Sequence, residues 1–309
     1  MIYTITLNPA LDRTIYVEHL LERESIKVLR EERYAGGKGI DVSRVIAQLG
    51  GESIAIAFLG GYAGKEMEGR LLNEGVAGHF IWTKGETRIN VIAHCIQTGR
   101  EIRFNFPGPT IQPQELSELV NICRNLSPKP TFAVISGSVP QGVNPVIYEN
   151  LILTFESQGA RVILDTYGEP LKKGLLATPF MIKPNRKELS ELVGTEIETI
   201  DDAISSGKEI LKYTQVIAVS LGREGLLGIT HGGIYLATPP EVEAVNTVGA
   251  GDSTVAAMVI ALEKQLPLDE VFRYGAAAGT ASTLTEGTAT VNVRDFKKIL
   301  AQTKIKRID

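Results

Sequence analysis

The residues best placed to do chemistry lie in one short stretch, 246–253 (NTVGAGDS). Three small residues, Gly249, Ala250 and Gly251, lead into an apolar helical pattern, so the unpaired N–H groups of the first helical turn can point at an anion. Asp252 follows in that turn and can take a proton from a hydroxyl that attacks a bound phosphate. The stretch therefore predicts an anion hole beside a general base. A structural alternative stays open, in which the glycines end a loop and Asp252 complements the helix dipole.

A second glycine-rich stretch, 36–41 (GGKGID), precedes another helical pattern near the N-terminus. Its glycines let the backbone approach a ligand closely, and Lys38 supplies a cation beside that backbone. The spacing differs from a GxxxxGK[ST] phosphate loop, because Lys38 is followed by glycine. No GxGxxG motif follows the first expected strand either. The sequence therefore argues against a P-loop enzyme and against a dinucleotide-dependent dehydrogenase.

Six motifs in their order along the chain resemble the phosphofructokinase B family of the ribokinase superfamily of sugar kinases. They are 6–12 (TLNPALD), 36–41 (GGKGID), 136–140 (SGSVP), 183–189 (KPNRKEL), 220–222 (SLG) and 248–253 (VGAGDS). The resemblance implies a ribokinase-like α/β fold, a three-layer α/β/α Rossmann-like sheet with a small β-sheet lid. It also implies a single kinase domain over residues 1–309, with lid segments at about 12–35 and 86–107. In that family, the aspartate that matches Asp252 is the catalytic base.

The resemblance further implies a site for ATP and Mg²⁺. Lys183, Asn185 and Glu188 match positions that organise the metal and the phosphates, with Asn185 and Glu188 acting on the metal indirectly. The same Asn-x-x-Glu spacing is also a capping box that satisfies only backbone donors, and this alternative stays open. Nucleotide binding is implied for five further positions: Ser220, Gly222, Gly225, Ala278 and Ser282. Without the resemblance, these positions indicate only a turn at a strand end and a packed helix.

Cations near the glycine loop and the expected lid indicate an acceptor that already carries a phosphate. Lys38, Arg88 and Arg103 match phosphosugar-binding positions of the family, and arginine forks suit a phosphate dianion. Asp12 can accept hydrogen bonds from a sugar diol, although an ordinary turn aspartate is the alternative. The expected acceptor site is completed by Gly36, Gly37, Asp41 and Ser138.

Position 41 departs from the family pattern, because aspartate stands where asparagine usually follows Gly-Lys-Gly-Ile. Aspartate keeps an acceptor but loses the amide donor. Its negative charge is expected either to weaken phosphosugar binding or to be offset by Lys38. Lys38 and residues 87–91 (TRINV) resemble 1-phosphofructokinases and tagatose-6-phosphate kinases, whereas Arg103 is more similar to the 6-phosphofructokinase pattern.

The elements that must hold these residues alternate between strand and helix, which predicts a parallel α/β sheet. Strands are expected at 2–7, 54–59, 131–136, 161–165, 180–182, 215–220, 226–230 and 233–237, the last two as an antiparallel pair. Helices are expected at 66–72, 113–124, 143–158, after Asn185, and at 251–262, 268–284 and 293–302. A hairpin of 87–97 and 101–106, together with exposed strands in 13–33, predicts a small sheet outside the main core.

Composition narrows the class of protein. The 309 residues are 43% hydrophobic and 22% charged, as in an ordinary globular enzyme, and the net charge of −4 argues against a nucleic-acid partner. No apolar run approaches the roughly 18 residues of a membrane-spanning helix, so no membrane partner and a cytoplasmic location are expected. Cys95 and Cys123 lack partners at zinc spacing and are expected to be reduced packing residues, with a disulfide between them as the alternative.

These features together predict an ATP- and Mg²⁺-dependent phosphofructokinase that converts a ketohexose monophosphate to a bisphosphate. Fructose 6-phosphate is the favoured acceptor, giving fructose 1,6-bisphosphate, ahead of fructose 1-phosphate and tagatose 6-phosphate. A non-catalytic sugar- or nucleotide-binding regulator is the alternative from another class. An exposed lid sheet has open edges and the family often pairs such lids, so a homodimer through the β lid is expected. The family can also bind K⁺, which makes that ion a further candidate.

Overall fold

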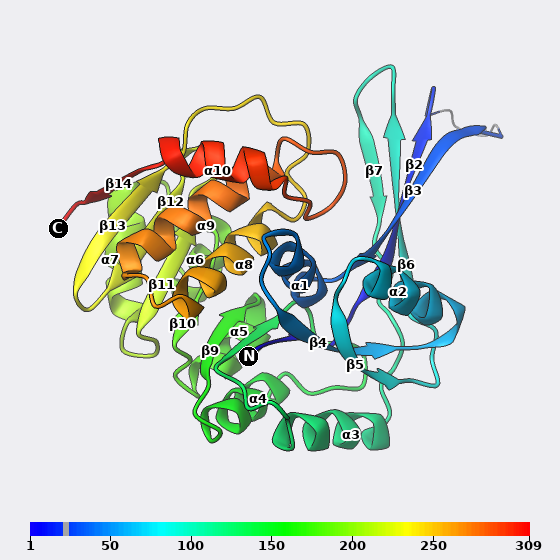
Figure 1. Ribbon diagram of the computed structural model, residues 1–309, viewed down its shortest axis with the longest axis horizontal. Helices are drawn as coiled ribbons and strands as arrows, with labels where there is room; N and C mark the ends of the chain where they lie inside the picture. Colours follow the sequence, from blue (N-terminus) through cyan, green and yellow to red (C-terminus); the bar gives the residue numbers. More distant parts are fainter. Residues whose placement is uncertain (21–24) are drawn as a thin grey trace.

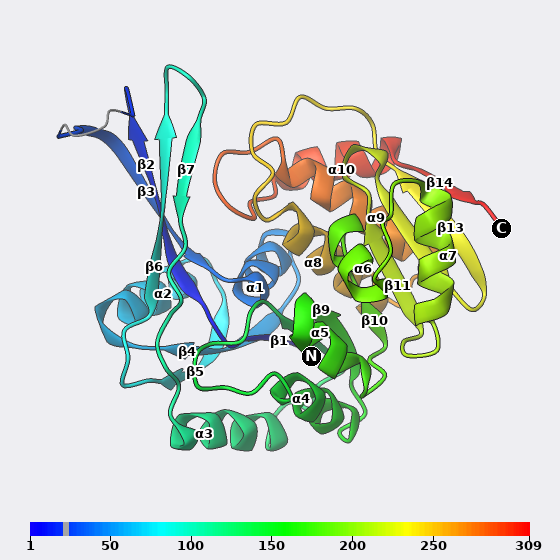
Figure 2. The ribbon, with the colours of Figure 1, turned by 180° about the vertical axis from the view of Figure 1, so that it is seen from behind.

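The computed structural model describes residues 1–20 and 25–309, which form two sheets and the helices around them (Figure 1 and Figure 2). The larger sheet has ten strands in the order β14-β13-β12-β11-β10-β9-β8-β1-β4-β5. From β11 to β5 in this order, neighbouring strands are parallel. From β11 to β14 they are antiparallel. The expected α/β sheet and its antiparallel pair are confirmed.

The bounds of the elements follow the printed sequence closely. The strands of the larger sheet are β1 (Ile2–Thr6), β4 (Ser53–Leu59), β5 (Ala77–Trp82), β8 (Phe132–Ser136), β9 (Arg161–Asp165), β10 (Met181–Ile182), β11 (Val216–Ser220), β12 (Leu226–Thr230), β13 (Gly233–Thr238) and β14 (Lys304–Arg307). The helices are α1 (Lys38–Gln48), α2 (Gly61–Asn73), α3 (Pro113–Arg124), α4 (Ile147–Glu156), α5 (Gly168–Leu175), α6 (Arg186–Val193), α7 (Ile200–Ile210), α8 (Ala250–Glu263), α9 (Leu268–Ser282) and α10 (Val293–Gln302), with a 3-10 turn η1 (Gly222–Glu224).

Helices cover both faces of the larger sheet, and this explains the continuous apolar character of its central strands. Strand β1 is buried along its whole length, with Tyr3 and Ile5 packed on one face and Ile2 on the other. The first face packs against α3 to α7, and the second against α1, α8, α9 and α10. The three-layer α/β/α arrangement that was expected for a ribokinase-like fold is therefore confirmed.

A smaller sheet of four strands, which we call the lid, projects from the main body (Figure 1). Its strands are β2 (Ala10–Val17), β3 (Val28–Gly36), β6 (Arg88–Cys95) and β7 (Glu101–Phe104), in the order β3-β2-β6-β7. The β6–β7 hairpin is antiparallel, and β2 pairs parallel with β6. The expected lid sheet is confirmed, although residues 21–24 of the expected lid segment 12–35 lie outside the described residues.

Some elements differ from the sequence expectation. Helix α4 begins at Ile147 instead of residue 143, because the N–H of Val146 donates to Asn144 Oδ1 and forms a turn before the helix. Helix α2 begins at Gly61, five residues earlier than expected. Strand β5 was not predicted: it is an edge strand with mostly exposed residues, so its apolar pattern is weak. Three further elements were also unassigned, namely α5, α7 and β14.

Neither cysteine is disulfide-bonded. Cys95 and Cys123 are buried free thiols, which confirms the expected packing role. Within residues 1–20 and 25–309, no helix is both long and apolar enough to cross a membrane. The same part of the chain contains no group of three or more His, Cys, Asp or Glu side chains placed to hold a metal ion.

Candidate active site

At the start of α8, the N–H of Ala250 donates to Thr247 O at 3.4 Å, whereas the N–H groups of Gly249 and Gly251 have no backbone acceptor among the described residues. Gly249 precedes the helix with φ of 81°, a left-handed conformation that favours glycine. A Cβ at Gly249 would lie 2.4 Å from the backbone nitrogen of Ala289, so no side chain fits there. A Cβ at Gly251 would lie 3.2 Å from Lys183 Nζ, which places that ammonium against the helix start. The predicted anion-hole residues therefore meet a lysine where the helix dipole already favours an anion.

Asp252 lies in the same turn and is only 8% exposed. Burial raises the pKa of Asp252 to about 7, while Lys38 and Lys183 oppose this rise and Asp165 adds to it. A carboxyl group whose pKa lies near neutrality is suited to accept a proton at working pH. The geometry therefore fits the base that the sequence predicts at this position.

Asp165, at the end of β9, connects the two lysines of the site, and the sequence analysis did not identify it. Its Oδ1 accepts hydrogen bonds from Lys38 Nζ at 3.1 Å and lies 3.4 Å from Lys183 Nζ. Burial alone would raise the pKa of Asp165, but the two lysines outweigh it and lower that pKa. Burial likewise opposes the charge of Lys38, but Asp165, Asp252 and Glu188 together raise the pKa of Lys38. Asp165 could have been found from the sequence by one signal: it is an acidic residue at the carboxyl end of a predicted parallel strand.

Asn185 and Glu188 form a capping box at the start of α6, as the alternative interpretation of the Asn-x-x-Glu spacing predicted. Asn185 Oδ1 accepts the N–H of Glu188 at 2.9 Å, and Glu188 Oε2 accepts the N–H of Asn185 at 2.9 Å. The same Glu188 carboxylate contributes to the pKa of Asp252, so it also lies within the field of the site. The box uses one carboxylate oxygen, and the second can still accept a hydrogen bond from metal-bound water. A role for these two residues in metal binding stays a prediction.

The five positions expected around the nucleotide fall into two groups. Ser220 ends β11 beside Asn185, and its N–H donates to Pro184 O at 3.0 Å, so the two motifs are adjacent. Gly225 follows η1 with φ of 105°, and a Cβ there would lie 2.0 Å from Ala237 O. Ala278 and Ser282 are buried in the α9 packing, and the Ser282 hydroxyl donates to Gly279 O. Their nucleotide contacts stay predictions.

Asp12 and Gly36 lie together where the lid joins the body. A Cβ at Gly36 would be 2.2 Å from Asp12 Oδ2, so glycine is required for this close approach. Asp12 Oδ1 accepts a hydrogen bond from Asn90 Nδ2 at 2.8 Å. Burial raises the pKa of Asp12, against the effect of the bond from Asn90. The sequence analysis did not identify Asn90 as a site residue, because only the pairing of β2 with β6 places it opposite Asp12.

Asp41 is buried at 4% exposure, and its charge is offset differently from the sequence expectation. Its Oδ1 accepts a hydrogen bond from Arg44 at 3.0 Å, whereas Lys38 pairs with Asp165. The expectation that Lys38 offsets the charge of Asp41 was therefore wrong. The side chain of Lys38 is directed to the end of β9, whereas Arg44 lies one helical turn from Asp41. Burial raises the pKa of Asp41, and Arg44 opposes that rise.

The two lid arginines occupy different environments. Arg88 donates to three backbone carbonyls, those of Asn8, Pro9 and Phe106, and so anchors the base of the lid. Arg103 is exposed and pairs with Glu101 on its own strand. The register places Arg103 opposite Ile92, on the lid face that also carries Asn90 and Asp12.

Ser138 follows β8 and lies near the base of the lid. Its hydroxyl accepts a hydrogen bond from Asn8 Nδ2 at 3.2 Å, and the same amide donates to Pro107 O. Asn8 therefore connects the segment after β1 to the segment after β8 and to the end of the lid hairpin. Ser138 is thus brought to the acceptor side of the site, and a contact with substrate stays a prediction.

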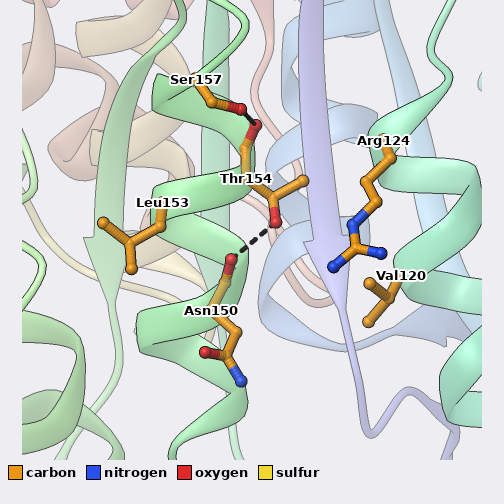
Figure 3. Close-up of a pocket in the computed structure, with 6 residues that line it drawn as sticks. All are labelled: Val120, Arg124, Asn150, Leu153, Thr154 and Ser157. Atoms are coloured by element: carbon orange, nitrogen blue, oxygen red, sulfur yellow. Dashed lines mark hydrogen bonds between the residues drawn. The ribbon is translucent and has the colours of Figure 1, made fainter.

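A surface hollow of about 570 Å³ lies elsewhere, between α3 and α4 (Figure 3). None of the predicted site residues lines it. The hydroxyls of Thr154 and Ser157 in its wall donate to carbonyls of their own helix. Helices α3 and α4 cover the sheet face opposite α1 and α8. The hollow therefore does not belong to the site built from the glycine motifs.

Comparison with known proteins agrees with this geometry. The family model described as pfkB family carbohydrate kinase matches residues 5–294. The chain is 35% identical to the 1-phosphofructokinase of Bacillus subtilis over 309 residues, covering 100% of both chains. It is 33% identical to a tagatose-6-phosphate kinase of Staphylococcus epidermidis over 311 residues, covering 99% of each.

A solved structure is similar along almost the whole chain. The structure of phosphofructokinase-2 from Escherichia coli in complex with potassium superposes with a TM-score of 0.92 at 36% identity, covering 97% of this chain and 98% of that one. These similarities extend over both the sheet body and the lid. The chain is therefore a member of the pfkB family of carbohydrate kinases, an ATP-dependent sugar phosphate kinase of the phosphofructokinase type.

Proposed function

We propose that this kinase transfers the γ-phosphoryl group of ATP to the free primary hydroxyl of a ketohexose monophosphate, giving a bisphosphate. The observation that carries the proposal is Asp252, a buried carboxyl group with a pKa of about 7 in the first turn of α8. Beside it lie Gly251 and the ammonium group of Lys183. A base next to an anion hole suits phosphoryl transfer to an alcohol, whereas a purely sugar-binding regulator needs no base.

In this mechanism, the oxygen of the acceptor hydroxyl attacks the γ-phosphorus of ATP, and ionised Asp252 accepts the proton of that hydroxyl. The bond between that phosphorus and the β-γ bridging oxygen breaks, and ADP leaves with the bond electrons. The N–H groups of Gly249 and Gly251, that of Ala250 once it is released from Thr247 O, and the Lys183 ammonium stabilise the charge on the transferred group. Lys38 adds positive charge on the same side, held there by Asp165.

Mg²⁺ fits the site as an ion carried chiefly by the nucleotide. The described residues contain no cage of three or more acidic, His or Cys ligands, and Mg²⁺ in kinases commonly binds through substrate phosphates, water and one or two carboxylates. Glu188 would contact the ion through water, with Asn185 beside it. When bound, the ion neutralises charge on the β- and γ-phosphates.

For the acceptor, we propose fructose 1-phosphate, with fructose 6-phosphate as the second candidate and tagatose 6-phosphate as the third. This order differs from the sequence expectation, which favoured fructose 6-phosphate. Arg103 is exposed and paired with Glu101, whereas Lys38 lies inside the site. Lys38 resembles 1-phosphofructokinases and tagatose-6-phosphate kinases alike, and the full-length relative named 1-phosphofructokinase is 35% identical, against 33% for the tagatose-6-phosphate kinase. In either fructose case the product is fructose 1,6-bisphosphate.

Three wider expectations accompany this proposal. Residues 1–309 are proposed to act as one kinase domain with a lid, since the family match crosses both sheets. A cytoplasmic location stays a prediction, supported by the cytoplasmic supply of ATP and sugar phosphates. Binding of K⁺ also stays a prediction, supported by the potassium complex of the Escherichia coli relative.

A homodimer through the lid is proposed from one face of that sheet. Ile102 and Phe104 on β7 are 44% and 52% exposed, and they pair with Ala93 and Val91. These residues point to the lid face opposite Asp12, so a partner could cover them without entering the site. Leu29 on β3 adds a further exposed apolar side chain. The same face also carries the ion pairs that Glu31 makes with Arg13 and Arg33. We propose that a second copy covers the apolar part of this face, at β6 and β7, and the open edge of the sheet.

The proposed acceptor can be tested by measuring ADP release in a coupled assay. With Mg-ATP, fructose 1-phosphate is expected to give the highest kcat/KM, followed by fructose 6-phosphate and then tagatose 6-phosphate. Unphosphorylated fructose is the control and is expected to react at least about 100-fold less efficiently, because its phosphate contacts are lost. A higher kcat/KM for fructose 6-phosphate would reverse the order, and no ADP release with any sugar phosphate would reject the kinase proposal.

Replacing Asp252 tests the proposed base. Asp252→Asn is expected to reduce kcat by about two to four powers of ten, because the amide cannot accept the proton. Binding of the sugar phosphate, measured by calorimetry, should change little. Asp295→Asn, in the first turn of α10, is the matched control and should keep wild-type kcat. A kcat for Asp252→Asn close to that of the control would contradict the assignment.

The pH dependence of kcat/KM follows from the same carboxyl group. Asp252 must be ionised to act as a base, and its pKa in the ligand-free protein is about 7. Because kcat/KM reports the ionisation of the free enzyme, it is expected to fall about tenfold per pH unit below pH 7 and to level off above it. The measurement is kcat/KM for the sugar phosphate from pH 5.5 to 9, with folding checked by circular dichroism. A flat profile across pH 7 with intact folding would count against Asp252.

The dimer proposal predicts the effect of a charge on the lid. Phe104→Asp is expected to convert a dimer to a monomer in sedimentation velocity at micromolar concentration, because the new carboxylate would be buried at the interface. Leu153→Asp on α4 is the matched control, since Leu153 is 50% exposed on a different surface. A wild-type protein that sediments as a monomer would refute the proposed homodimer.

A further inference from the structure

Arg44 is a buried arginine on α1 that the proposed mechanism does not use. Its side chain is 3% exposed, although arginine is almost never fully buried without partners. Its donors go to three acceptors from three parts of the chain: Asp41, Glu74 at the end of α2, and the carbonyl of Thr288. The contacts to Asp41 and Thr288 measure 3.0 and 3.2 Å. This guanidinium therefore joins segments that the sequence separates widely.

The contact with Asp41 leads to the glycine loop on the acceptor side. Arg44 holds Asp41 Oδ1, and Asp41 Oδ2 accepts the N–H of Gly37 at 3.3 Å. Gly37 precedes α1 with φ of 119°, and a Cβ there would lie 2.9 Å from Thr6. The loop beside Lys38 is therefore fixed from within by Asp41, whose own orientation depends on Arg44.

The contact with Thr288 leads to the anion hole. The next residue, Ala289, donates its N–H to Val248 O at 3.3 Å and packs directly against Gly249. Ala289 also has φ of 46°, an uncommon conformation for a residue with a side chain, so the surrounding contacts must hold it. Arg44 supplies one of those contacts at the preceding carbonyl.

We propose that Arg44 is a positioning residue for phosphoryl transfer, fixing the acceptor loop at Gly37 relative to the anion hole at Gly249. This inference rests on the proposed kinase function and adds a residue to it. The fork geometry of arginine is needed, because Nη1 reaches both Asp41 Oδ1 and the Thr288 carbonyl while Nε is engaged by Glu74, just after α2. A lysine at the same position has one nitrogen and cannot hold all three in place.

The test is Arg44→Lys, which keeps the positive charge beside Asp41 but loses the fork. Its kcat is expected to fall about 10- to 100-fold, because small misplacements of reacting groups cost rates of that order. The KM for fructose 1-phosphate is expected to rise severalfold, while the KM for ATP stays within about twofold. If Arg44→Lys does not fold, Asp41→Asn with Arg44→Gln makes the pair neutral and hydrogen-bonded, and the same kinetic changes are expected.

Glu74→Gln is the matched control, because it weakens only the outer partner of Arg44, at the end of α2. It is expected to lower the melting temperature but to leave kcat and both KM values unchanged. If Arg44→Lys loses stability alone, or if Glu74→Gln reproduces its kinetic changes, the positioning role is overturned. If the wild-type protein releases no ADP, the proposed kinase function is rejected instead. Failure of the positioning role and failure of the proposed function are therefore distinguishable.

Discussion

The structure of the site depends on the compensation of one buried charge, that of Asp165. Its side chain is fully buried, and an unpaired carboxylate in that position would cost several kcal/mol. Lys38 and Lys183 lie 3.1 and 3.4 Å from its Oδ1 and keep it ionised. The same two lysines also face Asp252 and the first turn of α8. A single carboxylate thus holds both cations where a phosphoryl group would gain negative charge.

The order of strands in the sheet explains how these groups meet. Strands β9, β10 and β11 are parallel neighbours, so their carboxyl ends lie at the same edge of the sheet. Asp165 and Ser220 end β9 and β11, and Lys183 directly follows β10. Helices α1 and α8 lie side by side on one face, in contact, and their N-terminal turns bring Lys38 and Asp252 to that edge (Figure 1 and Figure 2). Open α/β sheets generally bind ligands at such an edge.

The body and the lid have different chemical content. The body holds the proposed base, the anion hole and the paired lysines, which any acceptor hydroxyl would require. The lid holds Asp12 and Asn90, which are hydrogen-bonded to each other, and Arg88, which donates to backbone carbonyls at the base of the lid. Arg44, in the role proposed for it, connects the glycine loop that precedes α1 to the segment that packs against the start of α8.

The sequence by itself predicted the α/β sheet, the small outer sheet and the two glycine stretches, because glycine spacing and apolar alternation are local properties of the chain. The ribokinase-like fold class came from the resemblance of six motifs to a known family. It did not reveal Asp165, Asn90 or Arg44 as site residues. Lys38 and Asp165 are 127 positions apart, and Arg44 and Thr288 are 244 apart, so only the folded sheet brings them together. The partner of Asp41 was likewise decided by tertiary structure, because a buried charge pairs with whichever opposite charge the packing places within reach.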